Sequence, residues 1–148
     1  MENLWTRIND KVPQYFEAIS RKYELSFLKI SDLKTAIVGN KFAIIISIGR
    51  FDVDVFYAVR VGDKKEVLHC GNFLAEKYTD EDRQGLLKGE GAENIVLNNL
   101  KVIASGMENK WAEISQGETK WIENFRNSKW YSVARLTQEE ENVLWKLI

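Results

Sequence analysis

Asp52 and Asp54 are the residues whose type and spacing could do chemistry. They stand two positions apart in a run of β-forming residues, and alternate residues of a strand project to the same face. Such paired carboxylates could bind a divalent metal ion or exchange protons during hydrolysis, with Glu66 and Lys64 or Lys65 as loosely suited companions. The alternative is that both are solvated acids on the outer face of a half-buried strand.

The single histidine, His69, and the single cysteine, Cys70, are neighbours in the chain. Neighbours in a strand point to opposite faces, so these two cannot act together as base and nucleophile. One cysteine cannot form an internal disulfide, and one cysteine with one histidine is no zinc ligand set. We therefore expect no catalytic residue, no metal and no cofactor, and we interpret Cys70 as a small buried hydrophobe.

A second group of acids, Asp80, Glu81 and Asp82, follows Thr79. These acids could present a negative surface to a basic partner. The run from Thr79 to Asp82 also has the form of a helix capping box. Since the helix macrodipole stabilises negative charge in a first turn, structure alone could also account for these acids.

An antiparallel sheet has to position Asp52 and Asp54. The residues from Thr35 to Val61 are rich in Ile, Val and aromatic side chains, and Gly39-Asn40 and Gly49-Arg50 are of the type that closes two-residue hairpins. A Gly49-Arg50 loop makes every facing pair large and apolar, which fixes the register. The predicted pairs are Ile48–Phe51, Ile46–Val53, Ile44–Val55 and Phe42–Tyr57. A further loop at Asp63-Lys64 then pairs Val59 with Leu68 and Tyr57 with Cys70.

The outer face of this sheet combines large apolar and charged groups. It is too apolar for plain exposure and too charged for a plain core, so either a helix covers part of it or a partner binds there. The residues expected on it are Ala43, Ile45, Ser47, Asp52, Asp54, Phe56, Ala58, Arg60, Val67 and His69.

Helical periodicity flanks the sheet on both sides. Apolar residues at steps of three and four predict a helix over 11–23, with Asp10 as its N-cap and Pro13 in its first turn, after a separate helical turn that carries Trp5. Residues 25–30 form a plausible first strand.

The C-terminal half, about 72–148, has the pattern of several short helices. The capping box at Thr79 opens one that ends near 88–91, a stripe from Ile95 to Ile114 bends at Gly106, and Thr137 to Glu140 forms a second capping box. The fold class is α+β: an antiparallel sheet of about four or five strands over 25–70, packed on one face by the helices, in a single domain 1–148.

Composition sets the cellular expectations. The net charge is −1 over 148 residues, so nothing attracts the chain to nucleic acid or to an anionic membrane surface. No apolar run approaches the roughly 20 residues of a membrane span. The N-terminal residues lack the basic start and apolar core of a signal peptide, so we expect a cytoplasmic protein.

The segment Trp111-Ala-Glu-Ile-Ser-Gln-Gly-Glu-Thr-Lys-Trp-Ile122, leading to Ser128-Lys-Trp130, carries a resemblance. In size, style and Trp/Gly punctuation the chain resembles the small cytoplasmic immunity proteins of bacterial polymorphic-toxin and contact-dependent growth inhibition systems. The resemblance implies a protein that binds a cognate toxin domain, often over its active site. No binding residue transfers by position.

The leading hypothesis is a non-enzymatic binding protein that neutralises a protein toxin by forming a stoichiometric complex. The residues expected to contact the partner are Asp52, Asp54, Phe56, Arg60, His69, Asp80, Glu81 and Asp82. One alternative is a metal-dependent hydrolase that uses Asp52 and Asp54. Another is an adaptor or self-associating structural module that uses the same sheet face, which leaves a homo-oligomer open.

Overall fold

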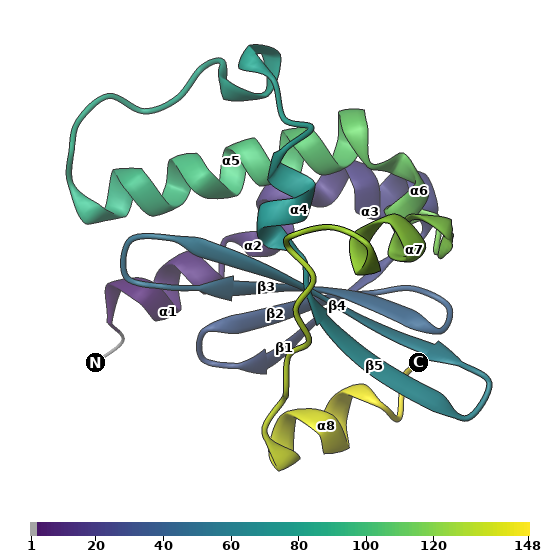
Figure 1. The fold of residues 1–148 in the computed structure, drawn as a ribbon. Helices are drawn as coiled ribbons and strands as arrows, with labels where there is room; N and C mark the ends of the chain where they lie inside the picture. Colours follow the sequence, from purple (N-terminus) through teal and green to yellow (C-terminus); the bar gives the residue numbers. More distant parts are fainter. Residues whose placement is uncertain (1–2) are drawn as a thin grey trace.

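A five-stranded antiparallel sheet forms the centre of the protein, in a computed structural model that describes residues 3–148 (Figure 1). The strands follow one another in chain order across the sheet. They are β1 (Ser26–Ser31), β2 (Lys34–Val38), β3 (Phe42–Ile48), β4 (Val53–Val61) and β5 (Lys64–His69). The predicted α+β class and strand number are confirmed.

The register of the β3–β4 hairpin differs from the predicted one by two residues. Ile46 faces Val55 rather than Val53, because the hairpin closes at Arg50-Phe51 and the Gly49 N–H donates to the Asp52 carbonyl at 2.9 Å. A shift of two keeps every side chain on its expected face, since side chains alternate with a period of two.

The β4–β5 hairpin is displaced in the same way. Its turn is Gly62-Asp63, with Gly62 at a positive φ of 62°, so Tyr57 faces Leu68 instead of Cys70. Glycine takes that backbone conformation without strain, which explains why the turn falls there.

Three short helices precede the sheet: α1 (Leu4–Asn9), α2 (Val12–Tyr15) and α3 (Glu17–Tyr23). The predicted helix over 11–23 is therefore broken at Phe16. Pro13 lies in the first turn of α2, as expected, but Lys11 occupies the N-cap position. Asp10 ends α1 instead, and its carboxylate accepts a hydrogen bond from Lys29 Nζ at 3.1 Å.

Six helical segments follow the sheet. They are α4 (Gly71–Ala75), the 3₁₀ helix η1 (Asp80–Arg83), α5 (Ala92–Lys110), α6 (Ala112–Ser115), α7 (Lys120–Arg126) and α8 (Gln138–Leu144). Both predicted capping boxes, at Thr79 and Thr137, are present. Two expectations are wrong: η1 ends at Arg83 rather than near 88–91, and α5 runs as one 19-residue helix through Gly106.

Both faces of the sheet are covered: the sequence predicted helices on one face and left open whether a helix or a partner covers the other. Residues of α1 to α7 pack on the inner face around Ile44, Ile46 and Tyr57. The opposite face packs against α8 and the residues beside it, and Figure 1 shows α8 across the sheet from α5. Within residues 3–148, none of the helices has both the length and the apolar character that crossing a membrane requires.

Candidate binding groove beside strand β4

The C-terminal segment covers much of the outer sheet face that the sequence assigned to a partner. Residues 132–134 run along the free edge of β5. The His69 N–H donates to the Ser132 carbonyl at 2.9 Å, and the Ala134 N–H donates to the Val67 carbonyl at 2.8 Å. Of the two alternatives drawn from the sequence, coverage by the chain itself accounts for most of this face.

Helix α8 is held on that face by polar and apolar contacts. Lys34 Nζ lies 3.0 Å from the Glu140 carboxylate, and Arg60 Nη1 donates to the Ile148 carbonyl at 3.2 Å. Burial alone would raise the pKa of Glu140, but hydrogen bonds from the Thr137 N–H and Lys34 lower it overall. Arg60 is thus engaged within the chain. The apolar contacts come from Ala36, Ala43, Ile45, Ala58, Val67, Leu136, Leu144 and Ile148.

The side chains of Phe56, His69 and Asp54 lie next to one another where β5 ends, with His69 between the other two. The Phe56 ring packs on His69, with ring centroids 4.8 Å apart, and Phe56 is half-buried. His69 Nε2 lies 3.3 Å from Asp54 Oδ1, and both of these side chains keep considerable solvent exposure. The predicted outer-face position of all three residues is correct, but Phe56 acts mainly in packing.

The acids that follow Thr79 divide between surface and interior. Asp80 and Glu81 are exposed, whereas Asp82 is only 1% exposed. Its carboxylate accepts hydrogen bonds from the Thr79 N–H at 2.9 Å and from Ser105 Oγ at 2.8 Å. Asp82 therefore anchors η1 to α5 and is not available to a partner.

Electrostatics explains how Asp82 stays ionised in the interior. Burial alone would raise its pKa, but hydrogen bonds from Thr79, Ser105 and Asn109, together with the charge of Lys110, lower the pKa overall. Lys110 Nζ lies 3.5 Å from the carboxylate. A fully hydrogen-bonded and charge-paired carboxylate of this kind is a structural feature.

A groove of about 430 Å³ lies between the start of β4 and the helices above it. We call it the β4 groove. Asp52, Val53 and Asp54 form one wall, and Arg83 of η1 reaches it from the other side. The remaining lining residues are Val55, Gly71, Asn72, Ala75, Tyr78, Leu86, Asn98, Asn99, Val102 and Ile103.

Tyr78 is the most buried polar side chain along the β4 groove. It is 9% exposed, and its hydroxyl has no hydrogen-bond partner among the described residues. Burial raises the pKa of the Tyr78 hydroxyl, and the nearby Cys70 and Asp82 add smaller electrostatic contributions in the same direction. The phenol is therefore protonated at neutral pH and can both donate and accept a hydrogen bond.

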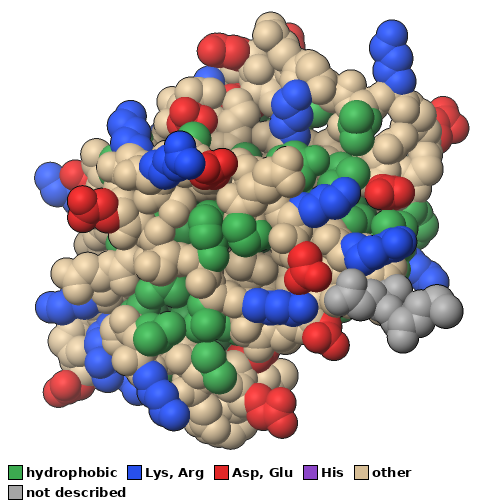
Figure 2. Space-filling view, turned by 180° about the vertical axis from the view of Figure 1, so that it is seen from behind, with side chains coloured by type: hydrophobic (Ala, Val, Ile, Leu, Met, Phe, Trp, Pro, Cys, Tyr) green, Lys and Arg blue, Asp and Glu red, His purple; other side chains and the backbone are tan. Residues whose placement is uncertain are grey.

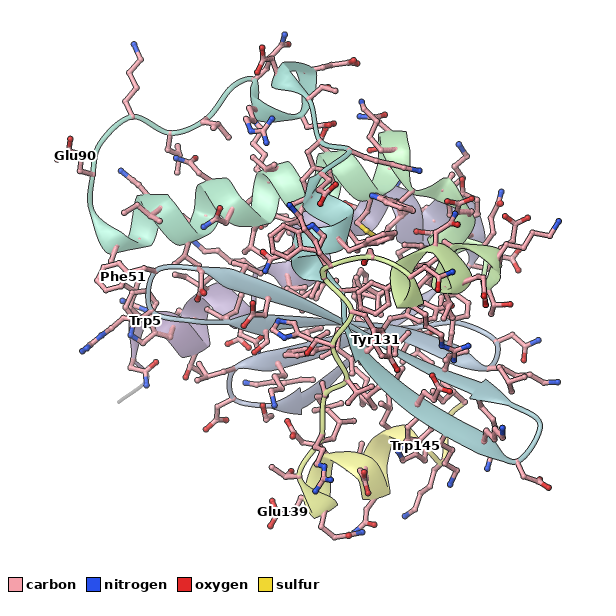
Figure 3. All side chains as sticks on the ribbon, in the orientation of Figure 1. Trp5, Phe51, Glu90, Tyr131, Glu139 and Trp145 are labelled. Atoms are coloured by element: carbon pink, nitrogen blue, oxygen red, sulfur yellow. The ribbon has the colours of Figure 1, made fainter. Side chains whose placement is uncertain are left out.

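Phe51 adds an exposed aromatic ring at the hairpin tip next to Asp52. Its side chain is 61% exposed, and Figure 3 shows it beneath the first turns of α5, at the end of the sheet where Trp5 also lies. Sequence reasoning missed Phe51 because the predicted hairpin placed it in the strand, opposite Ile48. The signal was present, since Gly49 and Asp52 can also flank a two-residue turn.

Sequence reasoning also missed Arg83 and Tyr78. The predicted helix continued through 83, and Tyr78 preceded any predicted element. No local pattern could have placed them near β4, because only the path of the chain through α4 and η1 brings them there.

The companions suggested for a metal site lie elsewhere. Arg126 Nη2 donates to both carboxylate oxygens of Glu66, at 2.9 and 2.8 Å, so Glu66 lies toward α7, on the other face from Asp54. Lys65 Nζ lies over the Trp145 ring. Within the part of the chain that the structure describes, no group of three or more His, Cys, Asp or Glu residues is placed to hold a metal ion.

On the face of the molecule opposite to that seen in Figure 1, positive and negative side chains are mixed. Figure 2 shows Lys/Arg and Asp/Glu side chains interspersed on that face, with apolar groups in patches between them. The fold and the β4 groove thus define an α+β protein with a mixed acidic and apolar recess at one end of its sheet. Comparison with protein-family models, with curated proteins and with solved structures finds no match.

Proposed function

We propose that this chain is a non-enzymatic binding protein that neutralises a cognate protein toxin by forming a stoichiometric complex. The observation that carries the proposal is the β4 groove, where Asp52 and Asp54 stand beside the exposed ring of Phe51. Acids next to an aromatic anchor are suited to a basic protein surface.

The support under these side chains is rigid. Strand β3 is almost entirely buried, and β4 is paired with it along seven residue pairs from Val53 to Val59. A hairpin held in this way orders its tip before binding, which lowers the entropic cost of association. The carboxylates would speed encounter with a basic partner, and burial of Phe51 would slow dissociation.

Because the C-terminal segment covers much of the outer face, we place the proposed contact surface at the end of the sheet. Asp52 and Asp54 stay in it, and exposed Asp80 and Glu81 belong to the same helical segment as Arg83. Arg60 and Asp82 are excluded from the proposed contact surface because their polar groups are engaged within the chain. Phe51 takes the role of apolar anchor that the sequence assigned to Phe56.

Co-expression tests this proposal. Candidate toxin domains, taken from the genes adjacent to that of this chain, are expressed in a sensitive bacterial host, each alone and together with the chain. We expect the chain to restore growth and to co-elute with the domain at a 1:1 ratio in light-scattering chromatography. Growth arrest that persists although both proteins are soluble would overturn the proposal.

A matched pair of variants links protection to the groove. Asp52→Lys/Asp54→Lys should reduce protection, whereas Glu139→Lys, an exposed acid on α8 far from Phe51 in Figure 3, should protect like the wild type. Equal protection by both variants would show that the partner binds elsewhere.

A further inference from the structure

We infer that strand β1 pairs with β1 of a second copy of this chain, so that the two sheets join into one antiparallel sheet in a twofold-symmetric dimer. The inference goes beyond the proposed function and does not rest on it, because no residue of β1 lines the β4 groove. Three features carry it: a free row of backbone groups, a self-complementary order of side chains, and a hollow beside them.

The two edges of the sheet differ in how the chain covers them. The outermost strands are β1 and β5 (Figure 1). Along β5 the chain closes the edge itself, because residues 132–134 bond to His69 and Val67. Within residues 3–148, no strand pairs with the outer side of β1. Of the five strands, β1 alone contains no buried residue. The β1 edge is therefore where another strand can be added.

Alternation along the strands shows which backbone groups of β1 are free. The Gly39 N–H donates to β3, so the preceding Val38 directs its N–H and C=O toward β1 instead. Val38 faces Ser26, which therefore bonds to β2. By the same alternation Phe27 and Lys29 direct their N–H and C=O groups away from the sheet. Within the described residues, no hydrogen bond reaches those four groups.

Hydrogen bonds from two polar side chains mark the ends of this free row. Ser20 Oγ donates to the Leu25 carbonyl at 2.6 Å, and the Leu25 N–H donates to the Ser20 carbonyl at 2.9 Å. At the other end, Asn9 Nδ2 donates to the Ser31 carbonyl at 3.2 Å. The open length of the edge is therefore 26–30, which suits one short partner strand.

Twofold symmetry and charge together select one register. When Phe27 faces Lys29 of the second copy, all four outward groups are paired, because the residues of a hydrogen-bonded pair exchange both bonds. If Lys29 faced Lys29 of the second copy, like charges would stand directly opposite each other, which is destabilising. If Phe27 faced Phe27 of the second copy, Lys29 would face Leu25 of that copy, whose backbone groups are already bonded.

The same register makes the side chains of the outer face complementary. Leu28 faces Leu28 of the second copy, and the exposed, small Ser26 faces the large Ile30 of the second copy. Leu28 and Ile30 both pack with the apolar cluster of that face. Beside Ser26 lies a hollow of about 950 Å³, whose wall includes Leu28 and the 54% exposed Leu147. Ile30 of the second copy is the apolar side chain placed to enter it.

Sedimentation velocity and light scattering of the full chain measure the self-association. We expect the mass to rise from that of a monomer at about 1 μM toward that of a dimer at about 1 mM, with a Kd of about 10–100 μM, as suits a small interface. Lys29→Pro removes an outward N–H but none that bonds to β2, and it should weaken the dimer at least ~10-fold. The matched control Lys29→Ala keeps that N–H and should change the Kd less than ~3-fold.

Cysteine variants test the register. In this register the two Leu28 residues form a pair without backbone hydrogen bonds, with Cα atoms about 4.5 Å apart, a separation that a disulfide can span. Leu28→Cys should therefore give a disulfide-linked dimer on mild oxidation. Ser26→Cys, the control, should not, because the two Ser26 positions lie four residues apart along the strands, about 13 Å. The native Cys70 is 1% exposed and should not contribute.

Three results would overturn the inference. They are a chain that stays monomeric up to about 1 mM, a dimer that Lys29→Pro leaves as tight as Lys29→Ala does, and equal cross-linking of the two cysteine variants. The cysteine variants keep every backbone N–H, so they decide the register even where proline lowers the stability of the fold. No toxin is present in these measurements. A monomeric chain that still restores growth would refute the dimer alone.

Discussion

Asp54 Oδ1 and His69 Nε2 lie 3.3 Å apart, at the point where β5 ends and β4 continues. The pair links the last residue of β5 to the wall of the β4 groove. Both side chains are partly exposed, so solvent screens their attraction and the pair adds about 0–1 kcal/mol to stability. Asp54 can therefore be substituted without loss of the fold.

The first prediction compares Asp54, at the partly exposed rim of the groove, with Ile46, in the buried core. Asp54→Asn should change the free energy of unfolding by no more than about 1 kcal/mol. Ile46→Asp, in a position with no solvent exposure, should prevent folding, because an unpaired buried charge costs several kcal/mol. Urea unfolding followed by circular dichroism measures both, and comparable damage from the two would contradict the observed register.

Coverage of the outer face by α8 gives the second prediction. Leu144 is fully buried against that face, whereas its neighbour Val143 is 41% exposed. Leu144→Ala should lower the free energy of unfolding by about 2–4 kcal/mol. Val143→Ala, the matched control, should stay within about 0.5 kcal/mol. Similar small effects at both positions would mean that α8 does not pack as described.

Much of the sheet could be predicted from local pattern. The alternation from Phe42 to Ile48 and from Val53 to Val59 determined which side chains point inward, and the structure confirms those faces. The exact loop residues could not be predicted, because Gly49-Arg50 and Arg50-Phe51 both satisfy the hairpin chemistry and both keep large apolar pairs. Only the packed structure distinguishes the two registers.

The candidate site was predicted less well, for a different reason. Asp52 and Asp54 are visible in the sequence, but Arg83 and Tyr78 reach the groove because η1 and the Tyr78 ring pack against α5. Likewise, no local signal indicates that residues 132–134 pair with β5. Contacts between segments so far apart in the chain are set by the whole fold.

The third prediction concerns acid stability and rests on Asp82. Its pKa is lower in the folded chain than in the unfolded chain, so its contribution is present above the unfolded pKa of about 3.9 and is lost as the pH falls through the folded value. Asp82→Asn should therefore reduce the free energy of unfolding by about 1–3 kcal/mol at pH 7, and the difference from wild type should shrink by pH 3.

Urea titrations at the two pH values measure this difference. Asp80→Asn is the control, because Asp80 is the exposed neighbour in the same first turn, and it should differ little from wild type at either pH. A deficit in Asp82→Asn that is as large at pH 3 as at pH 7 would show that ionisation of Asp82 does not stabilise the fold.

The fourth prediction concerns Cys70, which is 1% exposed. Burial is the main cause that raises the pKa of its thiol to about 12. The native protein should therefore resist iodoacetamide at pH 8, where the unfolded chain reacts readily, because the thiolate is the nucleophile. Because the pKa of the thiol is higher in the folded chain than in the unfolded chain, the free energy of unfolding also depends on pH here. The contribution of the buried thiol to that free energy is full below the unfolded pKa of about 8.5 and declines as the pH rises above it. Rapid alkylation of the folded protein, detected by mass spectrometry, would contradict the described burial.

The most direct test of the central claim is the binding kinetics of the cognate toxin domain with groove variants. Asp52→Lys/Asp54→Lys should slow association at least ~10-fold and reduce its salt dependence, whereas Phe51→Ala should mainly speed dissociation. Glu139→Lys, with its exposed acid on α8, should bind like the wild type, and circular dichroism should show the same fold for all three. If the groove variants associate and dissociate at wild-type rates, the β4 groove is not where this protein binds its partner.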